Sequence, residues 1–325
     1  MYDIQENSIA TQTIIIYSNL RFFINEIFSF LDPSMFFYSD TVQLRAIYYK
    51  DEEKMLPNIQ LHKKKKKCFR NSLNLHFLLL PNNQKVNIKV STTGKFQATG
   101  CKNYNNSLDC IIYFLQLIYS SPHLFTIINL SNAADSMKKE ILLGFQIVMT
   151  NIDFNVGFEI DRAILHDLLN NENTSSLSLL DTSFGYTGMN VKFPVCKDTI
   201  ETPLPILSLL PYFNNVENIS SLKERKPFFE ISELRTLKEE VTKELFFPVV
   251  CVKNDKQRYN TFLVFHSGTI IMSGRSLETM ELHYSMFRSL LDKLKPQIQY
   301  QYRENEMSEK SKTSKKKVSK SNIIL

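Results

Sequence analysis

The chain contains one sequence pattern twice, and this repeat limits the possible folds more than any other feature. The segment Val90-Ser-Thr-Thr-Gly-Lys-Phe-Gln-Ala-Thr-Gly100 can be laid over Val264-Phe-His-Ser-Gly-Thr-Ile-Ile-Met-Ser-Gly274. In each copy a β-rich run meets a glycine, and a second β-rich run ends in Thr-Gly or Ser-Gly. This order predicts a β-hairpin in each half, with Gly94 and Gly268 in the turns.

A helix is predicted after each hairpin. In the first copy Ser107 is the expected N-cap, Pro122 follows the end, and apolar residues recur at helical spacing at Leu108, Ile111, Leu115 and Ile118. In the second copy Ser276 is the expected cap, Pro296 ends the helix, and the stripe is Met280, Tyr284, Phe287, Leu291 and Leu294. Helices with one apolar face are expected to lie on a sheet.

The beginnings of the two halves also match. Ile14–Phe22 resembles Gln146–Phe154, and each run is expected to be a strand that leads into a helix. Each half therefore reads as strand, helix, several strands and helix. We predict a first repeat at 12–121 with a basic loop at 51–68, a linker at 122–140, a second repeat at 141–296 with an insertion at 194–259, and a disordered basic tail at 303–325.

Two segments outside the repeated pattern have alternative interpretations. The five-lysine run Lys63–Lys67 is expected to be a solvated loop, although it would also attract DNA in a salt-sensitive way. Within the insertion, Ser232 is expected to cap a helix whose apolar stripe runs from Leu234 to Leu245. We expect that stripe to pack within its own insertion rather than to dock on a partner.

Composition and missing motifs narrow the class of function. With 325 residues and a net charge of +6, the chain is long enough for two domains and only mildly basic. Its apolar stretches are shorter than the ~20 residues that cross a bilayer, and it opens without a secretory signal, so we expect a soluble protein. The five scattered cysteines include no CxxC pair, which indicates reduced thiols and no zinc site. Because glycine-loop, HExxH and GxSxG motifs and paired carboxylates are missing, we predict a protein that is not an enzyme and needs no cofactor or metal.

The second hairpin resembles the signature of the TATA-box-binding protein family. In that family one strand ends in Ile-Phe-x-Ser-Gly-Lys and the next in Thr-Gly-Ala-Lys; here the matching segments are Thr261–Gly274 and, in the first half, Thr99-Gly100-Cys101-Lys102. The insertions and diffuse identity resemble the divergent versions that large DNA viruses encode. The resemblance implies an α+β fold in which two βα repeats form one curved antiparallel saddle, with the helices on its convex face.

The resemblance also implies that paired aromatic side chains at each end of the saddle enter the minor groove and partly unstack a base step. Phe265 falls on one second-half position, and Tyr186, in Phe184-Gly-Tyr-Thr-Gly188, falls on its partner position. In the first half Phe69 fits one position, whereas the other holds Ser91, which cannot intercalate. Without the motif, Phe265 would be interpreted as a core residue of a buried strand.

Other positions of the family carry over to the groove floor and to the phosphates. The implied floor residues are Thr13, Gln97, Thr99, Ile271 and Ser273, of which Thr99 and Ser273 also fit ordinary sheet hydroxyls. The implied phosphate contacts are Lys95, Lys102, Lys192 and Arg275. Thr269 and Leu75 stand where the family has basic residues, and its two base-reading asparagines map to Thr13 and to the neighbourhood of Gln146. These departures imply weaker phosphate contact.

The function implied by the resemblance is transcription initiation. Such a protein would act as a monomer that binds and bends double-stranded promoter DNA through the minor groove. It would prefer AT-rich DNA, because TA steps deform easily and the guanine amino group would clash with an apolar floor. It would recruit RNA polymerase and a factor-IIB-type protein, in the nucleus or, for a viral protein, in a cytoplasmic viral factory or virion, without a membrane. Two alternatives stay open: a scaffold of the same fold that has lost DNA binding, and a nucleic-acid enzyme, which would need clustered carboxylates.

Overall fold

The structure is a computed structural model, and its description covers part of the chain. It describes residues 9–37, 39–57, 71–80, 82–120, 129–130, 140–171, 177–180, 188–195, 206–212, 228–233 and 257–300. Several predictions fall outside these residues: Phe69, Tyr186, the lysine run Lys63–Lys67, the apolar stripe from Leu234 to Leu245 and the tail at 303–325.

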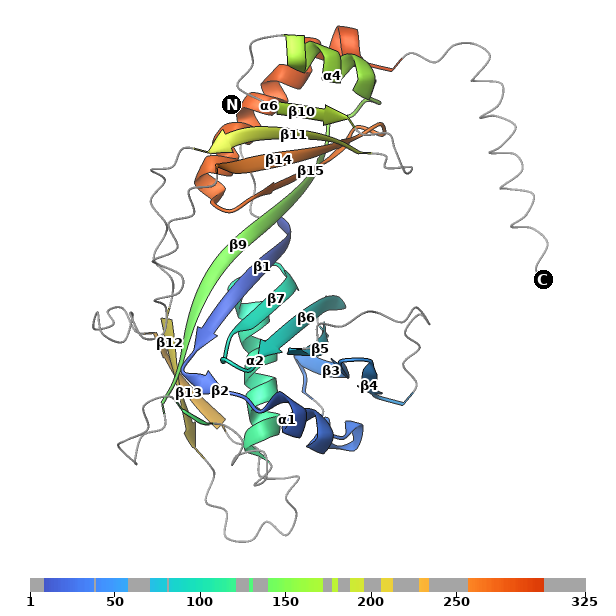
Figure 1. Ribbon diagram of the computed structural model, residues 1–325. Coiled ribbons are helices and arrows are strands. Elements are labelled where there is room, and N and C mark those ends of the chain that lie inside the picture. The colour runs from blue at the N-terminus through green and yellow to red at the C-terminus, as the bar shows by residue number, and fades with distance from the viewer. Residues whose placement is uncertain are drawn as a thin grey trace, which may run out of the picture.

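One antiparallel sheet organises the described residues (Figure 1). It has 13 strands, and the pairs run antiparallel throughout. A few helices accompany this sheet, so the predicted α+β class is confirmed. No helix of the described residues is both long and apolar enough to cross a membrane.

The first half begins with a long strand and ends with a long helix. Its elements are β1 (Ile9–Ser18), β2 (Leu20–Arg21), α1 (Ile24–Phe30), a 3-10 turn (Pro33–Met35), β3 (Val42–Tyr49), β4 (Glu52–Met55), β5 (Ser72–Leu79), β6 (Gln84–Ser91), β7 (Phe96–Cys101) and α2 (Tyr104–Tyr119). The short strand β8 (Asn129–Leu130) then pairs with β2 in a separate two-stranded sheet.

The second half has the same kinds of elements and one added hairpin. They are β9 (Ile141–Asn155), α4 (Arg162–Asn171), β10 (Leu177–Leu180), β11 (Gly188–Val195), β12 (Ile206–Tyr212), β13 (Phe228–Glu233), β14 (Arg258–Phe265), β15 (Thr269–Gly274) and α6 (Leu277–Ile298). The pair β12 and β13 lies in the sequence between β11 and β14 and is the added hairpin.

Strand order repeats between the halves. From the centre outward the first half reads β1, β7, β6, β5, β3, and the second half reads β9, β15, β14, β11, β10. In both, the first strand lies innermost, the last strand lies beside it, and the others follow outward in reverse chain order. Since β1 and β9 pair with each other, the two halves share one continuous sheet.

Each half has its own hydrophobic core on one side of the sheet. The first core includes Ile14, Phe96 and Phe114 and is covered by α1 and α2. The second includes Phe262, Phe287 and Leu165 and is covered by α4 and α6. Figure 1 shows α4 and α6 together on one side of β11, β14 and β15. Strand side chains alternate between buried and half-buried, because successive residues point to opposite sheet faces.

The added hairpin of the second half packs on the first half. Strand β12 pairs with the beginning of β9, from Ile206 opposite Gly144 to Leu209 opposite Ile141. Leu207 and Leu209 are buried in the first core. A segment that follows β11 in sequence thus completes the core of the other half, and the sequence offered no sign of this contact.

Several element boundaries differ from the sequence predictions. Helix α2 begins three residues before Ser107, and its N-cap is Asn103, whose side chain accepts from the Asn106 N–H at 3.1 Å. Ser232 lies in strand β13 and caps no helix, so that prediction was wrong. Helix α6 runs two residues past Pro296, which sits in its last turn and leaves the Asp292 carbonyl without the hydrogen bond that another residue there would donate. The predicted basic loop begins with strand β4.

Candidate nucleic-acid interface

The sheet face opposite the two cores carries most of the predicted site residues, and we call it the open face. In the second half it consists of alternate residues of β9, β11, β14 and β15, whose neighbours in the chain are core residues. Among the described residues no helix packs on this face. Its central members are Asn151, Asp153, Lys192, Thr261, Leu263, Phe265, Ile271 and Ser273.

The first half contributes a more polar stretch of the open face. Thr13 lies opposite Thr99 and Ile15 opposite Gln97, so three of the predicted floor residues come together there. Farther out, Asn87 and Lys89 continue the same rows on β6. The Thr99 hydroxyl donates to the Asn87 carbonyl oxygen at 3.3 Å. Asn87 and Lys89 had no signal in the sequence, because the family resemblance did not reach them.

Strand pairing corrects the match that the sequence suggested between the two halves. Asn151 lies opposite Ser273 in the second half, just as Thr13 lies opposite Thr99 in the first. Thr13 therefore corresponds to Asn151, and the match of Ile14–Phe22 with Gln146–Phe154 is six residues out of register. An even slip leaves every side chain on its own face, so apolar alternation could not reveal it.

Asn151 lies on the open face at the place that corresponds to Thr13, and the sequence did not point to it. Its amide oxygen accepts from the Ser273 hydroxyl at 2.7 Å, and its amide nitrogen donates to the Thr11 hydroxyl at 3.1 Å. These bonds fix the amide orientation while one N–H proton is left over. Gln146, the earlier candidate, pairs with Ile15 and accepts from the Tyr17 hydroxyl at 3.4 Å.

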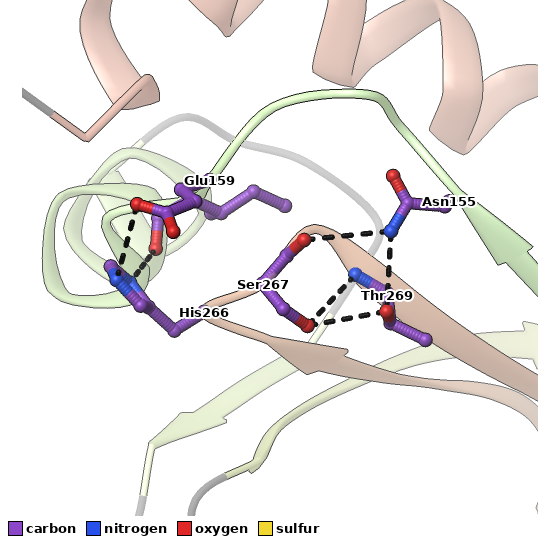
Figure 2. A network of polar contacts seen from close by, with 6 residues as sticks. Asn155, Glu159, His266, Ser267 and Thr269 are labelled. Carbon is purple, nitrogen blue, oxygen red and sulfur yellow. Dashed lines mark hydrogen bonds and ion pairs between the residues drawn. The ribbon is translucent and has the colours of Figure 1, made fainter. Parts of the chain in front are cut away.

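Phe265 lies at the outer end of β14, where the chain enters the Gly268 turn. It is half-buried, lies opposite Gly188 and is not sealed beneath a helix among the described residues. Figure 2 shows the turn beside it: Asn155 donates to the Ser267 carbonyl at 3.4 Å and to the Thr269 hydroxyl at 3.2 Å. His266 Nε2 lies 3.8 Å from the Glu159 carboxylate. Both flanks of the turn are therefore held by polar contacts.

At the corresponding end of the first half, Ser91 occupies the place that Phe265 holds in the second half. Ser91 lies opposite Ser72 at the end of β6. Its hydroxyl is 2.9 Å from the Thr93 hydroxyl and accepts from the Lys95 N–H at 3.1 Å. The Ser91 side chain thus closes its own turn instead of projecting a ring, and the two ends of the open face differ.

The predicted phosphate contacts occupy four separate places. Lys95 and Lys102 are exposed at the two ends of β7, and the Lys95 Nζ lies 5.3 Å from the Tyr17 ring centroid. Lys192 is half-buried on β11, 6.0 Å from the Tyr259 ring centroid. Arg275 follows β15; burial raises the pKa of Tyr17, and the Arg275 charge opposes that rise. Arg275 is thus close enough to act on a residue of the other half.

Leu75 does not occupy the basic position that the resemblance gave it. It is fully buried in the first core, because odd-numbered residues of β5 face the helices. On the open face, His76 holds the place that Lys192 holds in the second half.

No group of three or more His, Cys, Asp or Glu side chains among the described residues is arranged to hold a metal ion.

Comparison with solved structures gives a likeness of shape. No family model matches the chain, and no curated protein matches it. Among solved structures the chain is similar to Methanococcus jannaschii TBP, at 9% identity and a TM-score of 0.41, over 88% of this chain and 98% of that one. A similarity of this size does not assign the chain to a family.

Proposed function

We propose that this protein is a DNA-binding transcription initiation factor that holds AT-rich promoter DNA against the open face and bends it through the minor groove. The observation that supports this most is the repeated strand order, which joins two matching halves into one sheet with helices on a single side. In this proposal the sheet curves into a saddle, and the helices lie on its convex side. The protein acts as a monomer and performs no catalysis.

Bending would depend on aromatic side chains at the ends of the open face. Phe265 is placed at the last residue of β14, next to a turn that polar contacts hold in position. Inserting a ring between base pairs costs a few kcal/mol per step, and the longer contact with bent DNA offsets that cost. Tyr186 and Phe69 would serve as further wedges, at the second and first end respectively.

Affinity would come from the positive residues around the open face. Lys95, Lys102, Lys192 and Arg275 are spread over both halves, as contacts to two phosphate backbones require. The floor residues Thr13, Thr99 and Ser273 would line the groove. Each phosphate contact releases counterions, so binding would weaken steeply as salt rises. RNA polymerase and a factor-IIB-type protein would bind the helices and the 194–259 insertion.

A bending experiment tests this proposal. Fluorescence energy transfer between the ends of an AT-rich duplex reports the bend, and a gel shift reports affinity. We expect Phe265→Ala to abolish most of the bend and to weaken binding about tenfold or more, because a stacked ring contributes about 1–3 kcal/mol. Tyr186→Ala should add to this loss.

The control is Phe23→Ala, which removes a 53% exposed phenylalanine beside α1 and should leave both readouts unchanged. Equal bending by the wild type and a Tyr186→Ala/Phe265→Ala double variant would exclude the wedge mechanism.

A scaffold without DNA affinity is the second candidate function. It is favoured by Ser91, which stands where the resemblance implies an aromatic residue at the first-half end, and by the Asp153 carboxylate on the open face. A pull-down that recovers transcription proteins, together with no binding to any duplex at low salt, would establish this version instead.

A further inference from the structure

A carboxylate lies on the open face where the proposed function would place the floor of the minor groove. Asp153 is exposed on β9, between the core residues Ile152 and Phe154, and it pairs across the sheet with Ile271. It is two residues beyond Asn151, so its side chain lies about 7 Å farther along the same face. The sequence did not point to Asp153, because the match that it suggests between the two halves is six residues out of register.

No described residue neutralises Asp153. The structure gives its carboxylate neither an ion pair nor a hydrogen bond within the described residues. Lys192 on the same face is three strands away, about 14 Å at the usual strand spacing. Nearby, Asn151 and Ser273 already bond to each other. The carboxylate therefore keeps its capacity to accept hydrogen bonds from a ligand.

The first half has different chemistry at the corresponding place. Ile15 corresponds to Asp153, since they lie two residues after Thr13 and Asn151 on their strands. Gln97 corresponds to Ile271, since each lies opposite one of these two residues on the neighbouring strand. The first half thus offers an amide that can donate, whereas the second half offers a group that can only accept. The two halves have similar backbones, but the first could donate a hydrogen bond to a base pair here and the second could only accept one.

Minor-groove chemistry makes this difference decisive. An A·T pair shows only acceptors there, adenine N3 and thymine O2, whereas a G·C pair adds one donor, the guanine N2 amino group. A carboxylate set against acceptors loses its hydration and gains no bond, which is costly. Gln97 can donate to N3 or O2 of any pair.

We propose that Asp153 accepts a hydrogen bond from the N2 amino group of a guanine, so the otherwise AT-rich binding site contains one G·C pair beneath the second half. This inference rests on the proposed function and specifies its DNA sequence. Because only one half carries the carboxylate, the G·C pair also fixes the direction in which the protein sits on DNA. An otherwise AT-rich site thereby becomes directional.

Base analogues test the inference without changing the protein. A set of AT-rich duplexes carries a single G·C pair moved stepwise through the site, and affinity is measured by fluorescence anisotropy. We expect one position to bind about tenfold more tightly with G·C than with A·T, the size of one good base contact. Inosine·C, which lacks N2, should lose this gain, and diaminopurine·T, which adds N2 to an A·T pair, should restore it.

A variant assigns the effect to Asp153. Asp153→Ile copies Ile15 of the first half and should remove the discrimination between G·C and inosine·C while binding the all-AT duplex more tightly. Asp167→Ile makes the same charge change at an exposed site on α4 and should keep the wild-type pattern. If G·C and inosine·C bind equally to the wild-type protein at every position, the inference is wrong while DNA binding stands. If the wild type binds no duplex at low salt, the proposed function fails and the inference with it.

Discussion

At the scale of single residues, two glycines hold matching turns in the two halves. Gly94 and Gly268 both have φ of 78°, a region that favours glycine. A Cβ on either would collide with a backbone carbonyl, that of Leu20 or of Phe158. The neighbouring hydrogen bonds also match: the Phe22 N–H donates to the Thr92 carbonyl at 3.1 Å, and the Ile160 N–H donates to the His266 carbonyl at 2.8 Å.

Gly268→Ala should therefore destabilise the fold by more than the backbone strain alone would, because the added Cβ also collides with the Phe158 carbonyl. Gly157 provides the matched control, because its φ is also positive, at 84°, and a Cβ there would meet nothing within 4 Å. We expect Gly157→Ala to cost about 1 kcal/mol and Gly268→Ala about 2–4 kcal/mol in free energy of unfolding, measured with urea. Equal costs at the two sites would show that the close approach to Phe158 is unimportant.

At the scale of elements, the sequence predicts type better than position. The glycine turns and flanking apolar alternation predict both hairpins, and the apolar stripes predict both long helices. Position failed where local signals compete: Asn103 and Ser107 are both good caps, and Asn103 forms the cap. The six-residue error in matching the sequence of β1 to that of β9 could not be detected, because apolar alternation repeats every two residues. It hid both Asn151 and Asp153.

The hairpin of β12 and β13 gives a prediction about coupling between the halves. Leu209 is fully buried in the first core, although its strand β12 belongs to the second half of the sequence. Leu209→Ala should lower the free energy of unfolding by about 2–4 kcal/mol, because it leaves a cavity. Hydrogen exchange should then accelerate in α2, far away in the sequence.

The matched control is Ile231→Ala on β13, where the side chain is 46% exposed. It should change both readouts little. Unchanged exchange in α2 with Leu209→Ala would mean that the hairpin does not support the first core.

At the scale of the whole molecule, the halves share a backbone plan but differ in side chains. The open face is continuous because β1 and β9 pair along their length. One half places Phe265 at its end and Asp153 on the open face, and the other half has Ser91 and Ile15 at the corresponding positions. Such asymmetry suits a ligand whose two ends differ, as a directional promoter site does.

Photo-crosslinking tests most directly whether DNA lies on the open face. A small diazirine-bearing residue replaces either Leu263, on β14 in the open face, or Leu282, which is 61% exposed on α6. With an AT-rich duplex bound, the account predicts a covalent protein–DNA product from position 263 and none from position 282. A product from position 282 with none from position 263 would contradict the account, because DNA would then lie on the helices.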